Sequence, residues 1–263
     1  MILRNFFFTI ILFNSAFAQS VNKSQSVPFP GTGPYTSQPD AFSFSTNPAA
    51  LSNYKENLLG VFSERKFLME ENSIHALYIG LPTKKGNFGF LLNYSGFSNF
   101  NQYEIAGAYA KKLGDLSAGI QFGYSSLKIT DYKKTNLFSA TIGVVFKVNP
   151  KFYTGFQVAN FIQSKYKNQK LPSTFRIGCG YQPSVSVFLG MDITKEENVP
   201  GSVLILLKYN YNQKFFSGLS FNAANITTSG SAGIGWNNYR VDISAGYHQY
   251  LGVSPGITFY TKL

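Results

Sequence analysis

The sequence predicts an all-β protein: a closed antiparallel transmembrane β-barrel of about 14 strands with a short N-terminal plug, or hatch, segment. Three observations predict this fold. The chain starts with an export-signal pattern, apolar and polar residues alternate along most of its length, and it is rich in Gly (24), Phe (26) and Tyr (17). Segments of about ten residues that are apolar on one face and small or polar on the other are typical of outer-membrane barrels.

Residues 1–18 have the pattern of a cleavable signal peptide. Arg4 precedes an apolar run over 6–13, and Ala16-Phe17-Ala18 fits a cleavage site with small residues at its ends. The run is too short to span a bilayer as a helix. The sequence therefore predicts export from the cytoplasm.

Residues 19–55 are predicted to form the plug. They are rich in Pro and Gly, which disfavour a long regular element. Within them, Asn47 suits the N-cap of a helix and Pro48 its first position, so Asn47-Pro48-Ala49-Ala50-Leu51 predicts one short helix ahead of the sheet. Gly-rich faces inside the barrel would leave a lumen that this arm can fill.

Residues 56–263 are predicted to form the barrel. In 138–148, Phe138, Ile142 and Val144 share an apolar face, whereas Ser139 and Thr141 share the opposite face. The strands are predicted near 57–66, 73–82, 86–96, 101–112, 116–129, 135–149, 152–162, 173–182, 185–195, 201–212, 215–224, 230–237, 239–249 and 254–263.

The connections between these strands alternate in length. Those after even-numbered strands are tight, and those after odd-numbered strands are mostly longer, as expected for periplasmic turns and outer loops. The last predicted strand ends in the apolar Leu263, as exported barrels often do. A secreted antiparallel β-sandwich is the rival architecture, because it would also alternate and follow a signal peptide. The aromatic character of the apolar faces and the Gly-rich opposite faces favour the barrel.

Composition argues against several classes of function. The formal charge of +11 is spread over Lys pairs on connections and forms no dense face, so no nucleic-acid partner is predicted. The single Cys179 excludes an internal disulfide framework. Neither His75 nor His248 lies in a Ser-His-Asp or metal-ligand pattern. A non-enzyme is expected, with no catalytic residue, metal or cofactor.

Two charges are predicted to pair in the lumen. Arg176 and Asp192 fall on inward faces of adjacent strands joined by a tight turn at 182–184. Around that turn, Arg176 is expected opposite Gly190, one diagonal step from Asp192, which long side chains can bridge. The favoured interpretation is an ion pair that helps to seat the plug, and the alternative is a substrate-binding pair. Further charges expected to face the lumen are Arg240, Asp242 and Glu104.

The chain also resembles a known family. The Asn-Pro-Ala-Ala-Leu stretch at 47–51, followed by about fourteen strands, resembles the hatch of the FadL superfamily of outer-membrane transport proteins. Further stretches resemble the PorV/PorQ branch, which belongs to the type IX secretion apparatus. They are "LPSTFRIGCGY" at 171–181, "SVFLGMDITKEEN" at 186–198, "GSVLILLKYNYNQKFFSGLSFN" at 201–222 and "SAGIGWNNYRVDISAGYHQYLGVSPGITF" at 231–259.

The resemblance implies a barrel in the bacterial outer membrane that serves a protein secretion or assembly complex through protein–protein contacts. Its partners would be other outer-membrane or periplasmic subunits and membrane lipid. The alternative is a passive transporter of small hydrophobic molecules, as FadL-like barrels are. The modest outer loops favour the first function, because a FadL-like capture site needs extended ones.

Overall fold

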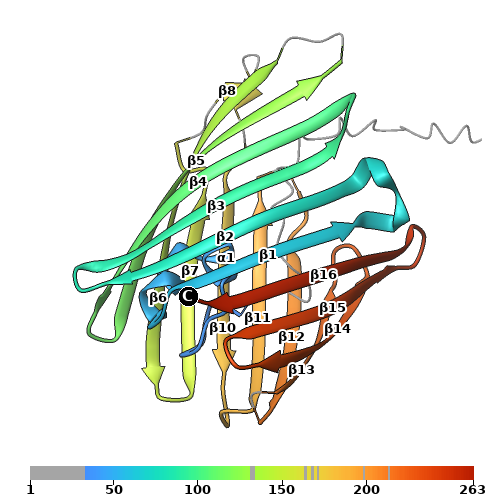
Figure 1. Ribbon diagram of the computed structural model, residues 1–263. Helices are drawn as coiled ribbons and strands as arrows, with labels where there is room; N and C mark the ends of the chain where they lie inside the picture. Colours follow the sequence, from blue (N-terminus) through green and yellow to red (C-terminus); the bar gives the residue numbers. More distant parts are fainter. Residues whose placement is uncertain are drawn as a thin grey trace, which may run out of the picture.

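The computed structural model describes residues 33–130, 134–162, 165–166, 169–170, 172–197, 199–212 and 214–263. Within them, 14 antiparallel strands form one closed barrel (Figure 1). The predicted signal peptide and the first part of the predicted plug, residues 19–32, lie outside the described residues. None of the helices within the described ranges is long and apolar enough to cross a membrane.

The barrel strands follow the chain in order, and the first pairs with the last. A separate two-stranded sheet, β8 (Lys165–Tyr166) with β9 (Gln169–Lys170), lies between β7 and β10 in the sequence. The barrel consists of β1 (Leu58–Arg65), β2 (Ser73–Thr83), β3 (Gly86–Phe97), β4 (Phe100–Leu113), β5 (Leu116–Ile129), β6 (Thr135–Asn149), β7 (Phe152–Ala159), β10 (Thr174–Tyr181), β11 (Val187–Glu196), β12 (Ser202–Tyr211), β13 (Phe215–Asn222), β14 (Thr227–Trp236), β15 (Tyr239–His248) and β16 (Gly252–Lys262).

Closure occurs between β1 and β16, where Val61 lies opposite Phe259. A closed sheet has no unpaired edge, which is what a strand surrounded by lipid requires, since lipid offers no hydrogen bonds to a free edge. The described ladders keep a regular register, apart from one shift between Lys147 and Asn149 where β6 meets β7.

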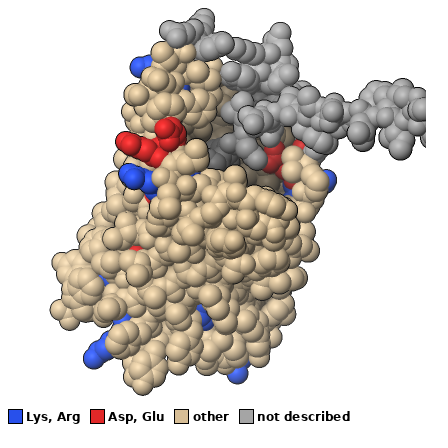
Figure 2. All heavy atoms as spheres, turned by 90° about the vertical axis from the view of Figure 1, so that its right-hand side faces the viewer, with Lys and Arg blue, Asp and Glu red and all other residues tan. Residues whose placement is uncertain are grey.

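The faces of the sheet are those that the alternation predicts. On β3, Phe88 and Phe90 point outward and are 43% and 49% exposed, whereas Leu91 and Asn93, which follow on the opposite face, are 5% and 8% exposed. Most of the charged atoms on the face in Figure 2 lie toward the two ends of the barrel, and the surface between is almost entirely uncharged. An apolar band between charged ends matches the hydrocarbon layer of a membrane.

The strand boundaries differ from the predicted ones mainly at two places. β7 ends at Ala159, before the predicted 162, and β14 begins at Thr227, before the predicted 230. The start of β14 was missed because its residues are small and polar on both faces, so hydrophobic alternation is absent. Even so, Thr228 pairs with Phe221 in the ladder.

Four short helices complete the described chain. α1 (Ser43–Thr46) and the 3₁₀ helix η1 (Pro48–Asn53) precede the barrel, and the 3₁₀ helices η2 (Lys66–Leu68) and η3 (Glu70–Asn72) connect β1 to β2. Asn47 caps η1, because its side-chain oxygen accepts a hydrogen bond from the Ala49 amide at 3.0 Å. The predicted helix at 47–51 is therefore present, as a 3₁₀ turn behind one α-helical turn.

Candidate functional site

Residues 33–54, here called the lumen segment, pack inside the barrel. Phe42 and Phe44 are fully buried and meet the Tyr78 ring edge-on, at centroid distances of 4.7 and 5.7 Å. Phe42 also meets the Tyr260 ring edge-on at 5.0 Å. Edge-to-face aromatic pairs at these distances are favourable, and their buried area adds to the attraction. The segment is thus held by apolar packing, although the sequence stretch lacks any periodic apolar pattern.

Glycines on the inward strand faces make room for the segment. A Cβ on Gly119 would lie 2.5 Å from the Ala49 nitrogen, and one on Gly60 would lie 2.6 Å from the Phe42 ring. One on Gly155 would lie 2.6 Å from the Tyr35 ring. The glycines that suggested an unfilled lumen therefore lie directly beneath the segment.

Two asparagines bind the segment by hydrogen bonds. The Asn47 amide donates to the carbonyls of Val144 and Phe156, both at 3.3 Å, which face each other across β6 and β7. The Asn87 amide on β3 donates to the carbonyls at the end of η1, with 3.0 Å to that of Tyr54. The predicted hatch residues Asn47, Pro48, Ala49, Ala50 and Leu51 are all buried here, with η1 against β4, β5 and β6. That the segment blocks solutes stays a prediction.

The predicted lumen pair lies on the expected face but in a different register. Arg176 lies opposite Thr194 in the ladder and not opposite Gly190. The connection spans residues 182–186, longer than predicted, so the first pair of the ladder is Tyr181 with Leu189. Asp192 remains a diagonal neighbour, since it lies opposite Gly178.

The guanidinium of Arg176 has other hydrogen-bond partners. Its Nη1 donates to the Thr46 carbonyl at 3.1 Å, and its Nε donates to the Thr194 hydroxyl at 3.3 Å. Arg176 therefore binds the lumen segment directly. An ion pair with Asp192 stays a prediction, as does a role for the two residues in substrate binding.

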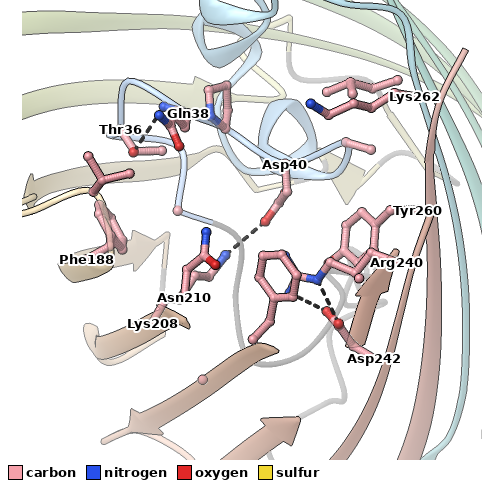
Figure 3. A pocket seen from close by; sticks show the side chains of 18 of the residues that line it. Thr36, Gln38, Asp40, Phe188, Lys208, Asn210, Arg240, Asp242, Tyr260 and Lys262 are labelled. Carbon is pink, nitrogen blue, oxygen red and sulfur yellow. Dashed lines mark hydrogen bonds and ion pairs between the residues drawn. The ribbon is translucent and has the colours of Figure 1, made fainter. Parts of the chain in front are cut away.

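A cavity of about 500 Å³ lies between the lumen segment and the strands β11 to β16. Asn237 and Asn238 at a short turn and Lys262 near the C-terminus line it, so it lies at the end of the barrel with the short turns. Figure 3 shows Asp40 reaching into it from the lumen segment, and Lys208 and Arg240 from β12 and β15. We call it the turn-end cavity.

Asp40 is the only charged residue of the lumen segment. One carboxylate oxygen lies 2.9 Å from the Lys208 ammonium, and the other accepts hydrogen bonds from the Phe42 amide at 3.1 Å and the Ser43 hydroxyl at 2.9 Å. Burial alone would raise the pKa of Asp40, but the Lys208 charge and hydrogen bond outweigh it and lower the pKa below its usual value. Asp40 therefore stays ionised at neutral pH.

Two buried tyrosines of the segment stay protonated. Burial raises the pKa of Tyr54 well above its usual value, and the Asp40 carboxylate adds to this effect. Burial likewise raises the pKa of Tyr35, with a further contribution from Asp192. The segment thus brings a single negative charge into the lumen.

The Arg240 guanidinium contacts two aromatic rings at the cavity wall. Its guanidinium carbon is 3.7 Å from the Phe216 ring centre and 4.7 Å from that of Tyr260. Its Nε donates to Asp242 at 2.7 Å, and Nη2 donates to the other oxygen of the same carboxylate. The lumen position predicted for Arg240 and Asp242 is found.

Sequence reasoning missed Asp40 and Lys208. Lys208 follows the apolar run 203–207 and could have been assigned inward by strand parity from Leu206. Asp40 carries no such signal, because its stretch has no period. Among the described residues, no group of three or more His, Cys, Asp or Glu could hold a metal ion.

A closed 14-strand barrel with an apolar exterior, and with residues 33–54 packed inside it, has the architecture of an outer-membrane β-barrel. Solved structures of outer-membrane barrels share this fold. The CymD monoaromatic hydrocarbon channel matches with a TM-score of 0.63 and 12% identity, over 89% of this chain and 95% of that one. The toluene transporter TodX of Pseudomonas putida matches with a TM-score of 0.62 and 9% identity, over 90% and 95%.

A third structure, the outer membrane protein Omp33 of Acinetobacter baumannii, matches with a TM-score of 0.54 and 10% identity, over 79% of this chain and 98% of that one. No family model and no curated protein sequence matches the chain. At these identities the likeness shows the fold.

The expected role in a secretion or assembly complex is contradicted. The structures that match nearly the whole chain include monoaromatic hydrocarbon channels, which favour the FadL-like alternative, and the PorV/PorQ branch is not shown. The quoted PorV/PorQ-like stretches misled because they are strands and tight turns. Alternation and inward Gly are requirements of any barrel with a filled lumen, whatever it transports.

Proposed function

We propose that this protein is an outer-membrane channel through which small hydrophobic molecules cross passively. The observation that carries the proposal is the likeness to monoaromatic hydrocarbon channels over 89% of the chain. The apolar exterior and the export-signal pattern support a location in the outer membrane. The signal peptide 1–18, the partner subunits and the plug 19–55 stay predictions.

The packing of the lumen segment suggests a route. The segment lies tightly on β3 to β6, whereas the turn-end cavity separates it from the opposite strands. Aromatic side chains line this cavity, among them Phe188, Phe216 and Tyr260. We therefore place the path of a solute between the segment and β12 to β16.

The test is the uptake of labelled toluene by cells that carry this protein in their outer membrane. We expect initial uptake several-fold above that of cells without it. Ser231→Phe narrows the cavity from β14 and should lower uptake, because Ser231 lines the cavity. Thr228→Phe adds the same ring on the exposed face of the same strand and should leave uptake unchanged. Uptake equal to that of cells without the protein refutes the proposal.

A further inference from the structure

The described charged side chains that line the turn-end cavity include one more cation than carboxylates. Its charged side chains are four cations, Lys55, Lys208, Arg240 and Lys262, and three carboxylates, Asp40, Glu56 and Asp242. Each carboxylate already has a cationic partner. Asp40 pairs with Lys208, Asp242 with Arg240, and Glu56 with Lys262 at 2.8 Å.

The two central cations keep unused N–H groups. An ammonium carries three N–H donors and a guanidinium five. Lys208 uses one on Asp40, and Arg240 uses two on Asp242; within the described residues these are the hydrogen bonds of the two cations. The side chains remain 30% and 27% exposed, and Figure 3 shows them directed into one space from two strands.

Flat apolar surface adjoins these donors. The Arg240 guanidinium lies over the rings of Phe216 and Tyr260. Phe188 lines the cavity on the other side of Lys208 (Figure 3). A neutral hydrocarbon entering here would gain contacts with the aromatic rings but would offer the free N–H groups no acceptor. A carboxylate on a small ring would accept from them while the ring contacts the aromatic side chains.

We propose that the turn-end cavity is a binding site for small aromatic carboxylates, with Lys208 and Arg240 as the ligands of the carboxylate group. A volume of about 500 Å³ lies within the range of small-molecule sites. This inference deepens the proposed function, because it names a solute class for the same path. The uptake of neutral toluene can succeed or fail independently of it.

The test is calorimetric titration of the full-length protein in detergent with benzoate, and with benzamide as a neutral compound of the same shape. We expect benzoate to bind at least tenfold more tightly than benzamide. Lys208→Met should remove most of this preference. Lys112→Met removes a lysine that does not line the cavity and should leave the preference intact.

Lys208→Met also leaves Asp40 without its partner, which could displace the lumen segment. The double variant Asp40→Asn with Lys208→Met removes both charges and so avoids an unpaired carboxylate. If Lys208 binds the ligand, the double variant loses the benzoate preference as the single one does. If Lys208 only holds Asp40, the double variant regains it. Recovery in the double variant, or equal binding of benzoate and benzamide by the unaltered protein, overturns the proposal.

Folding is checked for each variant by the faster migration of an unheated barrel in gel electrophoresis. Toluene uptake is measured on the same variants. Uptake of toluene without a benzoate preference refutes the carboxylate site and leaves the channel standing. A benzoate preference without toluene uptake supports the carboxylate site and refutes the hydrocarbon channel.

Discussion

The lumen segment meets the wall formed by β1 to β7 and the wall formed by β12 to β16 in different ways. Against the first, which we call the packed wall, it lies on glycines and buries Phe42, Phe44 and Leu51. Against the second, the cavity wall, it packs the Phe42 ring on Tyr260 and makes its one described charged contact, between Asp40 and Lys208, beside the turn-end cavity. We infer from this difference that apolar packing determines the position of the segment. The charged side chains instead line the turn-end cavity that the segment leaves open.

Removing the whole predicted plug, residues 19–55, which contains the lumen segment, should have the largest effect, because nothing then packs on either wall. A protein without residues 19–55 but with its signal should still insert, since the strands carry the lipid-facing surface. Its conductance in planar bilayers should rise several-fold above that of the full-length protein. Equal conductance of the two would contradict a plug and leave the segment as a docking arm.

Crowding the packed wall should have the next largest effect. Gly119→Ala places a Cβ 2.5 Å from the Ala49 nitrogen, and overpacking of this kind costs about 1–3 kcal/mol. Denaturant unfolding, followed by gel mobility, measures it. Gly107→Ala is the control, because a Cβ there has nothing within 4 Å. Equal free energies of unfolding for the two variants would contradict close packing of the segment on the packed wall.

Removing the Asn47 side chain tests the hydrogen bonds on the same wall. Asn47→Ala loses the cap on η1 and the donors to Val144 and Phe156, and should cost about 1 kcal/mol in the same unfolding assay. The barrel should still form. A loss as large as that of Gly119→Ala would mean that hydrogen bonds, and not packing, hold the segment.

Acid should produce the smallest effect, at the cavity wall. The folded-state pKa of Asp40 is lowered, so its stabilising contribution is present above the usual Asp pKa of about 3.9 and is lost as the pH falls through the lower folded value. An ion pair with this exposure contributes no more than about 1 kcal/mol. Between pH 6 and strong acid, the unaltered protein should lose slightly more stability than Asp40→Asn. Parallel pH profiles of the two would contradict the assigned contact.

Alternation predicted the barrel, its strands and the inward side of Arg240 and Asp242, because one residue faces lipid and the next the lumen. It could not predict which side chains meet across the lumen. The pairing of Arg176 with Thr194 depends on the length of one turn, and a strand pattern looks the same at any even shift. Asp40 lies in a stretch with no period, and only the packing of its neighbours brings it to Lys208.

The position of the lumen segment ahead of β1 bears on how the barrel is assembled. η1 packs mainly on β4, β5 and β6, so these contacts span less of the sequence than closure between β1 and β16 does. Loops of shorter length close at lower entropic cost. A curved half of the sheet can therefore wrap around Phe42 and Phe44 before the C-terminal strands are paired. Pairing of β1 with β16 then closes a barrel that already contains the segment, so the segment does not have to enter the barrel after closure.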